Sequence, residues 1–384
     1  MILDEYTKPW MTEELADLRA MTRTFLEREM VPHEERWDEQ QQVDRDFWRK
    51  AGEQGLLCIS IPEEYGGGGG TFAHEAVIIE EQGYVYDTAW ANSVHSTIVA
   101  HYFASYGTEE QKRNWLPKLA SGEYVCGIAM TEPGTGSDLQ AIATRAVRDG
   151  DEYVVNGAKT FISNGTHADL MVLVVRTGDQ PGGKGLSLLV AETQDLPGYQ
   201  RGRALKKLGT HGQDTRELFF EDMRVPAANI LGGEEGYGMR HLMGALPQER
   251  LTIAVGAAVA CEAAVRLAID YAKQRKAFGK TLLEQQNTRF VLAECVADAF
   301  ATRTMVDNCI ERHLRGELDT AGASMAKFFS TDMQNKVVDR CLQLFGGYGF
   351  MWEYPIARMY ADARVQKIYG GTNEIMKELV ARSL

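Results

Sequence analysis

The sequence has little of what several classes of protein require. Its six cysteines include no CxxC pair, its closest two are fourteen positions apart (Cys295 and Cys309), and its eight histidines form no HExxH motif. These spacings exclude a disulfide framework and argue against a metal site. They predict buried, reduced thiols in a cytoplasmic protein that holds no metal.

Basic residues and long hydrophobic runs are also scarce. Lys and Arg total 41 against 54 Asp and Glu, a net charge of −13, so the basic surface of a nucleic-acid binder is missing. The longest apolar run, 253–261, is much shorter than the ~18–20 residues of a membrane span. The acidic start of the chain has no apolar stretch typical of a secretory signal. We therefore expect neither nucleic acid nor integral membrane association.

Hydrophobic residues make up 44% of the 384 residues, enough for a core in each of two or three domains. The first part, 1–125, has helical periodicity. Leu15, Leu18, Met21 and Phe25 fall on one face of a helix predicted over 13–30, which ends before a proline. Two more helices are predicted over 72–84 and 95–106.

From about residue 126 the pattern changes to short β-rich runs. They cover 153–155, 159–163, 170–176, 186–191 and 218–220. Asn156-Gly157 is a strong hairpin signal. Because no helix intervenes, these strands predict an antiparallel sheet or small barrel over 126–240.

The last part, 241–384, is helical again. Periodic stretches over 250–276, 283–315, 320–345 and 361–382 predict a four-helix bundle. The chain is therefore predicted to be α+β and mostly α, with an N-terminal helical domain (1–125), a middle β domain (126–240) and a C-terminal bundle (241–384).

One motif suggests a family. Residues 127–138 read GIAMTEPGTGSD, in which Gly134 and Gly136 let the backbone turn sharply beside a ligand, and Thr131 and Ser137 supply hydroxyl groups. This stretch resembles the flavin and thioester signature of the acyl-CoA dehydrogenases.

Further motifs follow in the order found in that family. They are Phe161-Ile162-Ser163, QRKAFGK over 274–280, QLFGGYG over 343–349 and IYGGTNEI over 368–375. LPQERL over 246–251 and MWEYPI over 351–356 are closest to the long-chain branch. The resemblance extends over essentially the whole chain.

The resemblance implies an FAD-dependent reaction. Such enzymes remove an α-proton and a β-hydride from an acyl-CoA thioester, which gives a trans-2-enoyl-CoA and reduced flavin, as in fatty-acid β-oxidation. Removal of the weakly acidic α-proton needs a placed base and donors to the thioester oxygen. The resemblance also implies an electron-transfer flavoprotein as electron acceptor, and a homotetramer built as a dimer of dimers.

The catalytic base is predicted to be Glu249. Many family members carry Glu immediately before the Gly-Thr of the C-terminal loop, where this chain has Gly370. The long-chain and isovaleryl branches carry it on a bundle helix before an Arg, which Glu249-Arg250 matches. Taken without the family pattern, Glu249 would be read as an ion-pair partner near a helix start.

The resemblance also assigns roles to other residues by their positions in the family's motifs. The Gly370 amide is expected to bind the thioester oxygen, and Arg275 and Gln286 to hold the flavin of a partner chain. The residues expected to bind the cofactor are Ile128, Met130, Thr131, Gly136, Ser137, Phe161, Ile162, Ser163, Arg275, Phe278, Gln286, Gln343, Leu344, Phe345, Gly346, Gly347, Thr372, Asn373 and Glu374. Those expected to bind substrate are Ser137, Pro247, Gln248, Glu249, Arg250, Gly370 and Gly371.

Two departures from the long-chain pattern leave the acyl group open. Arg240 stands where that branch has an aromatic residue, and Trp90 stands where it tends to have a small one. If Trp90 points into the acyl pocket, the pocket is shortened. If it points into the helical core, nothing changes.

Three alternatives remain at this point. An acyl-CoA oxidase or another oxygen-using flavoenzyme could share the fold, and rapid reoxidation in air would identify it. A non-catalytic scaffold predicts loss of the base or of the flavin contacts. An NAD enzyme is disfavoured because no GxGxxG follows a strand.

Overall fold

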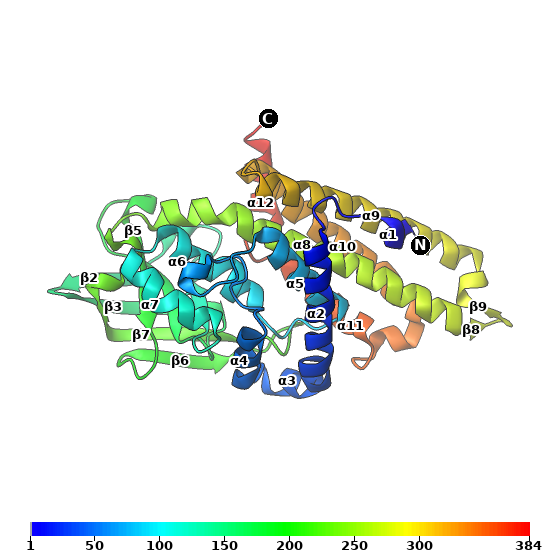
Figure 1. Ribbon diagram of the computed structural model, residues 1–384, viewed down its shortest axis with the longest axis horizontal. Coiled ribbons are helices and arrows are strands. Elements are labelled where there is room, and N and C mark those ends of the chain that lie inside the picture. The colour runs from blue at the N-terminus through cyan, green and yellow to red at the C-terminus, as the bar shows by residue number, and fades with distance from the viewer. Residues whose placement is uncertain (1) are drawn as a thin grey trace.

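The computed structural model describes residues 2–384 (Figure 1). The N-terminal part is helical, as predicted. Its helices are α1 (Ile2–Glu5), α2 (Glu13–Glu29), α3 (Glu34–Gln40), α4 (Arg45–Glu53), α5 (Phe72–Tyr84), α6 (Ala100–Tyr106) and α7 (Glu109–Ala120). Side chains cap the starts: Thr12 accepts from the Leu15 amide, and Thr108 and Gln111 form a capping box on α7.

The helix predicted over 72–84 is confirmed as α5, whereas the one predicted over 95–106 differs. It begins two residues earlier, as a π-helix over Ser93–Val99, and continues as α6. A π-helix is rare and occurs often at functional sites. Its wider turn leaves backbone carbonyls that other groups must satisfy.

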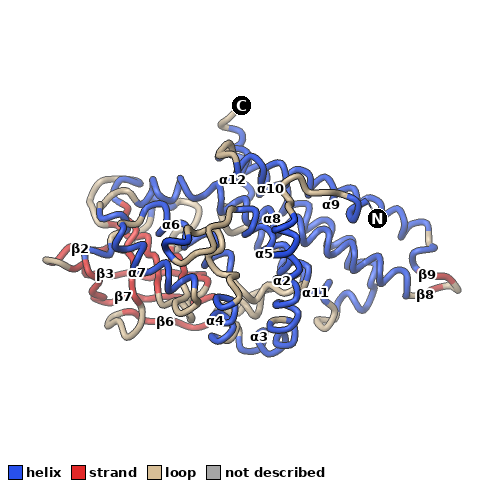
Figure 2. Tube along the Cα trace, in the orientation of Figure 1, coloured by secondary structure: helices blue, strands red, loops and turns tan. Residues whose placement is uncertain are grey.

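A seven-stranded sheet follows, and Figure 2 shows it gathered at one end of the molecule. Its strands are β1 (Cys126–Ala129), β2 (Arg145–Asp149), β3 (Glu152–Ser163), β4 (Leu170–Arg176), β5 (Leu186–Glu192), β6 (Tyr199–Ala204) and β7 (Thr215–Pro226). The order is β1-β4-β2-β3-β7-β6, with β5 also paired to β4. Most pairs are antiparallel as predicted, but β1 and β2 each pair with β4 in parallel.

The hairpin predicted at Asn156-Gly157 is wrong. Both residues lie inside β3, where the pairing with β7 shifts register between Val155 and Gly157. Gly157 has φ 151°, and a Cβ there would lie 2.6 Å from Thr144 Oγ1, so glycine is needed for a bulge and a close approach. The actual β2–β3 turn is at Gly150-Asp151.

The C-terminal part is a helical bundle. It contains α8 (Gly238–Gln274), the small hairpin β8 (Lys276–Ala277) and β9 (Lys280–Thr281), α9 (Gln286–Leu314), α10 (Thr320–Phe345), α11 (Pro355–Ala363) and α12 (Asn373–Ala381). The stretch predicted as one helix over 361–382 is therefore broken into the end of α11, a loop, and α12. Gly370 and Gly371 in that loop have positive φ, which interrupts the helix.

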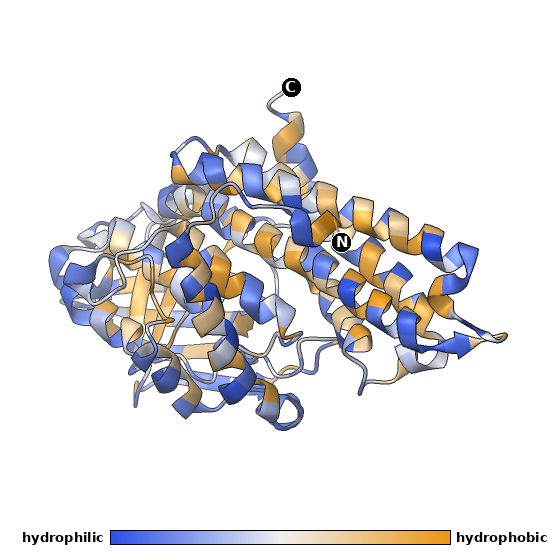
Figure 3. Cartoon of the chain, turned by 45° about the vertical axis from the view of Figure 1, so that its right-hand side comes forward, coloured by the Kyte–Doolittle hydropathy of each residue, from blue (hydrophilic) through white to orange (hydrophobic). Residues whose placement is uncertain are grey.

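Helix α8 is the core element of the bundle. It runs from the sheet to the β8–β9 hairpin at the opposite end of the molecule (Figure 1), and by length and composition it is apolar enough to cross a membrane. However, 67% of its most apolar window is buried inside the protein, which is the pattern of a core helix. Figure 3 shows hydrophobic and hydrophilic residues alternating along the bundle helices.

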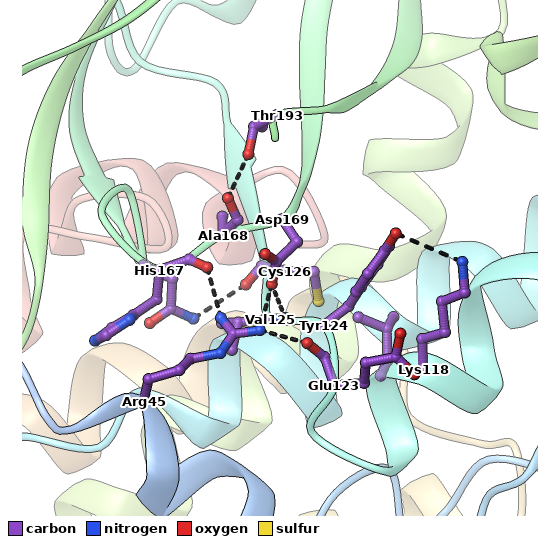
Figure 4. A network of polar contacts seen from close by, with 12 residues as sticks. Arg45, Lys118, Glu123, Tyr124, Val125, Cys126, His167, Ala168, Asp169 and Thr193 are labelled. Atoms are coloured by element: carbon purple, nitrogen blue, oxygen red, sulfur yellow. Dashed lines mark hydrogen bonds and ion pairs between the residues drawn. The ribbon is translucent and has the colours of Figure 1, made fainter. Parts of the chain in front are cut away.

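Two polar junctions fix the parts against each other. In Figure 4, Arg45 of α4 donates to the carbonyls of Glu123 and His167 and forms an ion pair with Asp169 at 2.6 Å. Asp169 also accepts from the Val125 amide, next to β1. These contacts hold the N-terminal helices against the sheet.

The second junction is a buried ion cluster around Arg303 of α9. Its guanidinium is 0% exposed and lies 2.7 Å from both Glu80 of α5 and Glu262 of α8, and 3.5 Å from Asp307. The cluster therefore joins the N-terminal helices to the bundle.

All six cysteines are buried and free, which confirms the predicted thiols.

Candidate active site

A cavity of about 650 Å³ lies where the N-terminal helices, the sheet and the bundle meet. Its walls come from the end of α5, the π-helix, β1, β3, α8 and the loop before α12. Most of this lining is apolar. The residues that were predicted as site residues and that line the cavity are Ile128, Met130, Thr131, Gly136, Ser137, Phe161, Ile162, Ser163, Glu249, Arg250, Gly370 and Gly371.

Glu249 stands on the α8 wall of this cavity and is 6% exposed. Pro247 precedes it inside the helix, where a missing amide hydrogen locally loosens the backbone. The hydroxyl of Tyr102 donates to Glu249 Oε1 at 2.6 Å. Burial raises the pKa of the Glu249 carboxyl, while the Tyr102 hydrogen bond and the charge of Arg250 act in the opposite direction.

Gly370 lines the same cavity from the loop before α12. Its φ is 64°, and a Cβ built there would overlap the Cδ1 atom of Ile253, one helical turn after Glu249. The loop therefore presents backbone and no side chain at this point. It therefore places backbone in the wall of the cavity that Glu249 also borders.

The glycine loop is held from behind by α10. The buried Lys327 ammonium donates to Gly371 O at 2.8 Å and to Asn373 Oδ1 at 3.0 Å, and burial lowers the pKa of Lys327 to about 8. The amide of Asn373 donates in turn to Thr331 and Asp332. These contacts fix the loop conformation.

Both polar atoms of the Asn373 side chain are hydrogen-bonded to α10, and a contact between Asn373 and the flavin stays a prediction. Thr372 caps α12 by accepting from the Ile375 amide, and Glu374 is exposed in the first turn. Within residues 2–384 neither belongs to the cavity lining, and Asn373 does not either.

Two predicted substrate residues, Gln248 and Arg250, form hydrogen bonds with other helices of the protein. The Gln248 amide donates to Thr97 O at 2.7 Å and its oxygen lies 3.1 Å from His313 Nε2. Gln248 thus satisfies a carbonyl of the π-helix and ties α8 to it. Neither Pro247 nor Gln248 is among the described residues that line the cavity, whereas Arg250 is, with its guanidinium 3.3 Å from Ser324 Oγ.

The β-sheet side of the cavity carries unused hydrogen-bonding groups. The hydroxyls of Thr131, Ser137 and Ser163 form no hydrogen bond with any other group of residues 2–384. Phe161 has φ 61°, and its ring is 67% exposed. A strained residue that exposes an aromatic ring to a cavity is a feature expected of a ligand contact.

These groups fit a flavin. An apolar cavity with free hydroxyls along one wall can cover a flat aromatic ring system and bond its polar edge. The residues that would hold the ring are Thr131, Ser163 and Phe161, with the Ile128 and Met130 side chains beside them. Chemically, bound FAD supplies the acceptor for a hydride.

The other predicted cofactor residues lie at the far end of the bundle. The Arg275 guanidinium is 5.8 Å from the Tyr348 ring, and Phe278 on the β8–β9 hairpin is 98% exposed. Arg275 is twenty-six positions after Glu249 on the line of α8, about 40 Å along a helix axis. One chain therefore does not bring its two sets of predicted cofactor residues together.

This second set is mixed in exposure. Gln286, Gln343, Gly346 and Gly347 are exposed, and the side chain of Leu344 packs partly against the bundle core. Phe345 is buried and stacks on Tyr271 with ring centroids 4.1 Å apart, so its side chain is structural.

The two departures from the long-chain pattern have different outcomes. The Trp90 ring lies in the N-terminal aromatic core, 5.2 Å from Phe47 and 6.0 Å from Trp48, while the residue also borders the cavity. Trp90 is thus held in the core and forms part of the wall. Arg240 is exposed beside Tyr237 and does not belong to the lining among the described residues.

Sequence reasoning missed Tyr102, Lys327 and the π-helix residues Ser93, Val94 and Ile98 in the wall. Nothing local in the sequence indicates that Tyr102 meets Glu249, because the two are 147 positions apart. Across the described chain, 2–384, no group of three or more His, Cys, Asp or Glu side chains is arranged to hold a metal ion.

Comparison with known proteins matches all three parts. Family models of the acyl-CoA dehydrogenase N-terminal, middle and C-terminal domains match residues 12–123, 127–223 and 236–384. The long-chain specific acyl-CoA dehydrogenase of Rattus norvegicus mitochondria is 48% identical over 368 residues, which covers 95% of this chain and 85% of that protein.

Solved structures with the same fold also cover nearly the whole chain. An acyl-CoA dehydrogenase from Geobacillus kaustophilus is 49% identical and superposes with a TM-score of 0.96, covering 98% of this chain and 99% of that one. A glutaryl-CoA dehydrogenase from Mycobacterium smegmatis in complex with FADH2 is 26% identical, with a TM-score of 0.92 over 99% of this chain and 96% of that one.

Proposed function

The chain belongs to the acyl-CoA dehydrogenase family, FAD-dependent oxidoreductases, and from this membership we propose that Glu249 removes the α-proton of its acyl-CoA substrate. The product is then a trans-2-enoyl-CoA. The observation that carries the proposal is that one cavity is bordered by both a buried carboxyl on α8 and a glycine at 370.

Four other carboxyl groups border the cavity, and three of them are engaged by other groups of the protein. Asp362 accepts from Thr88 and Thr210, Asp138 caps a short helix, and Glu378 pairs with Arg382. Asp87 accepts from the Ala89 amide and also borders a small side cavity with Glu34 and Asp38. Glu249 alone among the five is on α8, the helix that packs against the glycine loop through Ile253.

Gly370, Glu249 and Lys327 have separate roles in the proposed reaction. The thioester oxygen gains negative charge as the α-proton leaves, and the Gly370 amide is the donor that stabilises it. Burial raises the pKa of Glu249, which makes its carboxylate a stronger base than an exposed glutamate. Lys327 keeps the donor loop in place through Gly371 O.

We propose a long straight acyl chain as the substrate. The rat relative is named for long-chain substrates, and the apolar part of the cavity lining includes Ile79, Val94, Ile98, Met243 and Leu246. Trp90, fixed in the aromatic core, limits the cavity at one edge. We therefore expect the distance between the Trp90 wall and Glu249 to determine which acyl-chain length the enzyme prefers.

We also propose an oligomer in which Arg275 and Gln286 reach the flavin of a partner subunit. The distance of about 40 Å along α8 separates this set from the cavity of its own chain, and exposed Phe278 stands beside it. We further propose that the oligomer is a homotetramer and that an electron-transfer flavoprotein accepts the electrons from the reduced flavin.

An anaerobic titration tests the reaction. The FAD-loaded protein is mixed with straight-chain acyl-CoAs from butanoyl to hexadecanoyl, and the flavin absorbance is followed. We expect bleaching, most complete with a long chain, and slow recovery when air is admitted. Absence of bleaching with every chain would contradict the proposed reaction, and fast recovery in air would indicate an oxidase.

A further inference from the structure

Tyr102 stands directly behind Glu249. It lies on α6, is 0% exposed, and its hydroxyl is 2.6 Å from Glu249 Oε1. Glu249 borders the cavity, whereas Tyr102 is not part of the lining within residues 2–384. The tyrosine therefore contacts the carboxyl from the protein side and leaves the cavity side open.

The hydrogen bond distinguishes the two oxygens of the carboxyl. Oε1 accepts from Tyr102, and Oε2 accepts from no group in the part of the chain that the structure describes. The Tyr102 hydroxyl likewise has Glu249 as its single partner among residues 2–384. One oxygen is thus held by the protein and the other is available to a ligand.

The direction of the hydrogen bond is fixed. Burial and the neighbouring Glu249 raise the pKa of Tyr102 well above its usual range, so the phenol keeps its proton and donates. Its ring is packed in a buried cluster with Phe103 and Leu242, and Tyr106 lies one turn further along α6 with ring centroids 6.0 Å apart. The donor is therefore held in place before substrate binds.

We propose that Tyr102 is the positioning residue of the base: it anchors Glu249 Oε1 so that Oε2 is presented to the α-carbon of the substrate. This inference rests on Glu249 being the base, as proposed above. The charged and titratable groups that face Glu249 are Tyr102 and Tyr106 from α6 and Arg250 from α8. Of these, Tyr102 is hydrogen-bonded to the carboxyl.

The proposal has two separable consequences. A hydroxyl that donates to the carboxylate stabilises its charged form, so loss of the hydroxyl makes the base harder to ionise. Loss of the anchor also lets the carboxylate rotate away from the α-carbon, which slows proton removal even when the group is fully ionised. Because Tyr102 does not border the cavity, substrate affinity should change little.

The test replaces Tyr102 by phenylalanine, which removes one oxygen atom and keeps the ring. We expect kcat of Y102F to fall about 10- to 100-fold, the loss of a hydrogen bond to a charged group, with KM within about two-fold of the wild type. We also expect the acidic limb of the pH profile of kcat/KM to move to higher pH. The substrate is the straight-chain acyl-CoA that bleaches the wild type most completely.

The matched control is Y106F. Tyr106 is on the same helix one turn away, and its hydroxyl forms no hydrogen bond to any described residue. Y106F should keep the wild-type pH profile. FAD absorbance and the unfolding temperature of both variants show whether each is folded and loaded.

Three results would overturn the proposal. Y102F with kcat within two-fold of the wild type and an unmoved acidic limb would do so, as would a shift of equal size in Y106F. If Y102F does not fold, infrared spectra of the wild type across pH, with E249Q as reference, report the Glu249 carboxyl directly. A carboxylate band without the shift that a strong phenol donor causes would then reject the anchor. Failure of the wild type itself to be reduced would reject the proposed reaction instead.

Discussion

Ile253 occupies the space that a side chain at Gly370 would need. A Cβ built on Gly370 would overlap Ile253 Cδ1, and Gly370 has φ 64°, which L-residues rarely adopt. Ile253 follows Glu249 by four positions, so both project from the same face of α8. The position of the carboxyl on α8 and the absence of a side chain at 370 are therefore two parts of one arrangement.

This relationship predicts that the base cannot simply be moved to the loop. The double variant E249Q/G370E should be as slow in the reductive half-reaction as E249Q alone, because Ile253 excludes the new side chain and the φ of the site strains it by about 1–2 kcal/mol. Adding I253A should restore at least about ten-fold activity over the double variant by opening the space. Steady-state kcat measures the effect, with I253A alone as control. Equal activity of the double and triple variants would contradict the account.

Lys327 should be needed for both stability and turnover. In K327M the carbonyl of Gly371 and the Asn373 oxygen lose their buried donor, which should cost about 1–3 kcal/mol in the free energy of unfolding and reduce kcat about ten-fold or more. K336M on the same helix is the control, since Lys336 is 47% exposed and pairs with Asp298 at the surface. There we expect less than about 1 kcal/mol. A K327M variant with wild-type kcat would show that the loop does not need this anchor.

The raised pKa of Glu249 makes a prediction about stability. Because the folded protein holds this proton more tightly than the unfolded chain, the stability contributed by protonated Glu249 is present at low pH and is lost as pH rises through the folded-state pKa. E249Q cannot ionise and avoids this loss. Chemical unfolding of the FAD-loaded proteins should show E249Q more stable than the wild type at neutral pH, with the difference closing toward about pH 4. A difference that stays constant with pH would contradict the assignment.

The buried cluster at Arg303 should dominate the junction between the N-terminal helices and the bundle. R303M leaves Glu80, Glu262 and Asp307 without their shared cation and should lower the free energy of unfolding by about 3–5 kcal/mol. R224M removes an exposed pair with Asp149 and Glu152 and should cost less than about 1 kcal/mol. Denaturant titration compares the two, and equal losses would mean that the cluster does not carry the junction.

Features with a local cause could be predicted from the sequence. Helix α5 was predictable because it has apolar periodicity. The contiguous motif around Glu249 predicted a site there, and the structure places Glu249 in the cavity wall. Buried strand β4, Leu170–Arg176, was predictable from the continuous apolar run over 170–175. In each case the residues that determine the feature lie within a few positions of one another.

Features that depend on distant partners could not be predicted. Asn156-Gly157 favours a turn locally, but pairing with β7 keeps it inside a strand. Gln248 and Asn373 sit in family motifs, yet Thr97 and α10 engage their side chains. Tyr102 reaches Glu249 across 147 positions, a contact that only the packing of α6 on α8 creates.

The most direct test of the central claim is a single-turnover comparison of two isosteric variants. FAD-loaded E249Q and D87N are each mixed anaerobically with the acyl-CoA that best reduces the wild type, and the rate of flavin bleaching is measured. Both remove a buried carboxyl group at the cavity, but only Glu249 is proposed to take the proton. We predict that E249Q loses at least about 1,000-fold in rate, while D87N stays within about ten-fold of the wild type. Fast bleaching in E249Q, or a loss in D87N that equals it, would contradict Glu249 as the base.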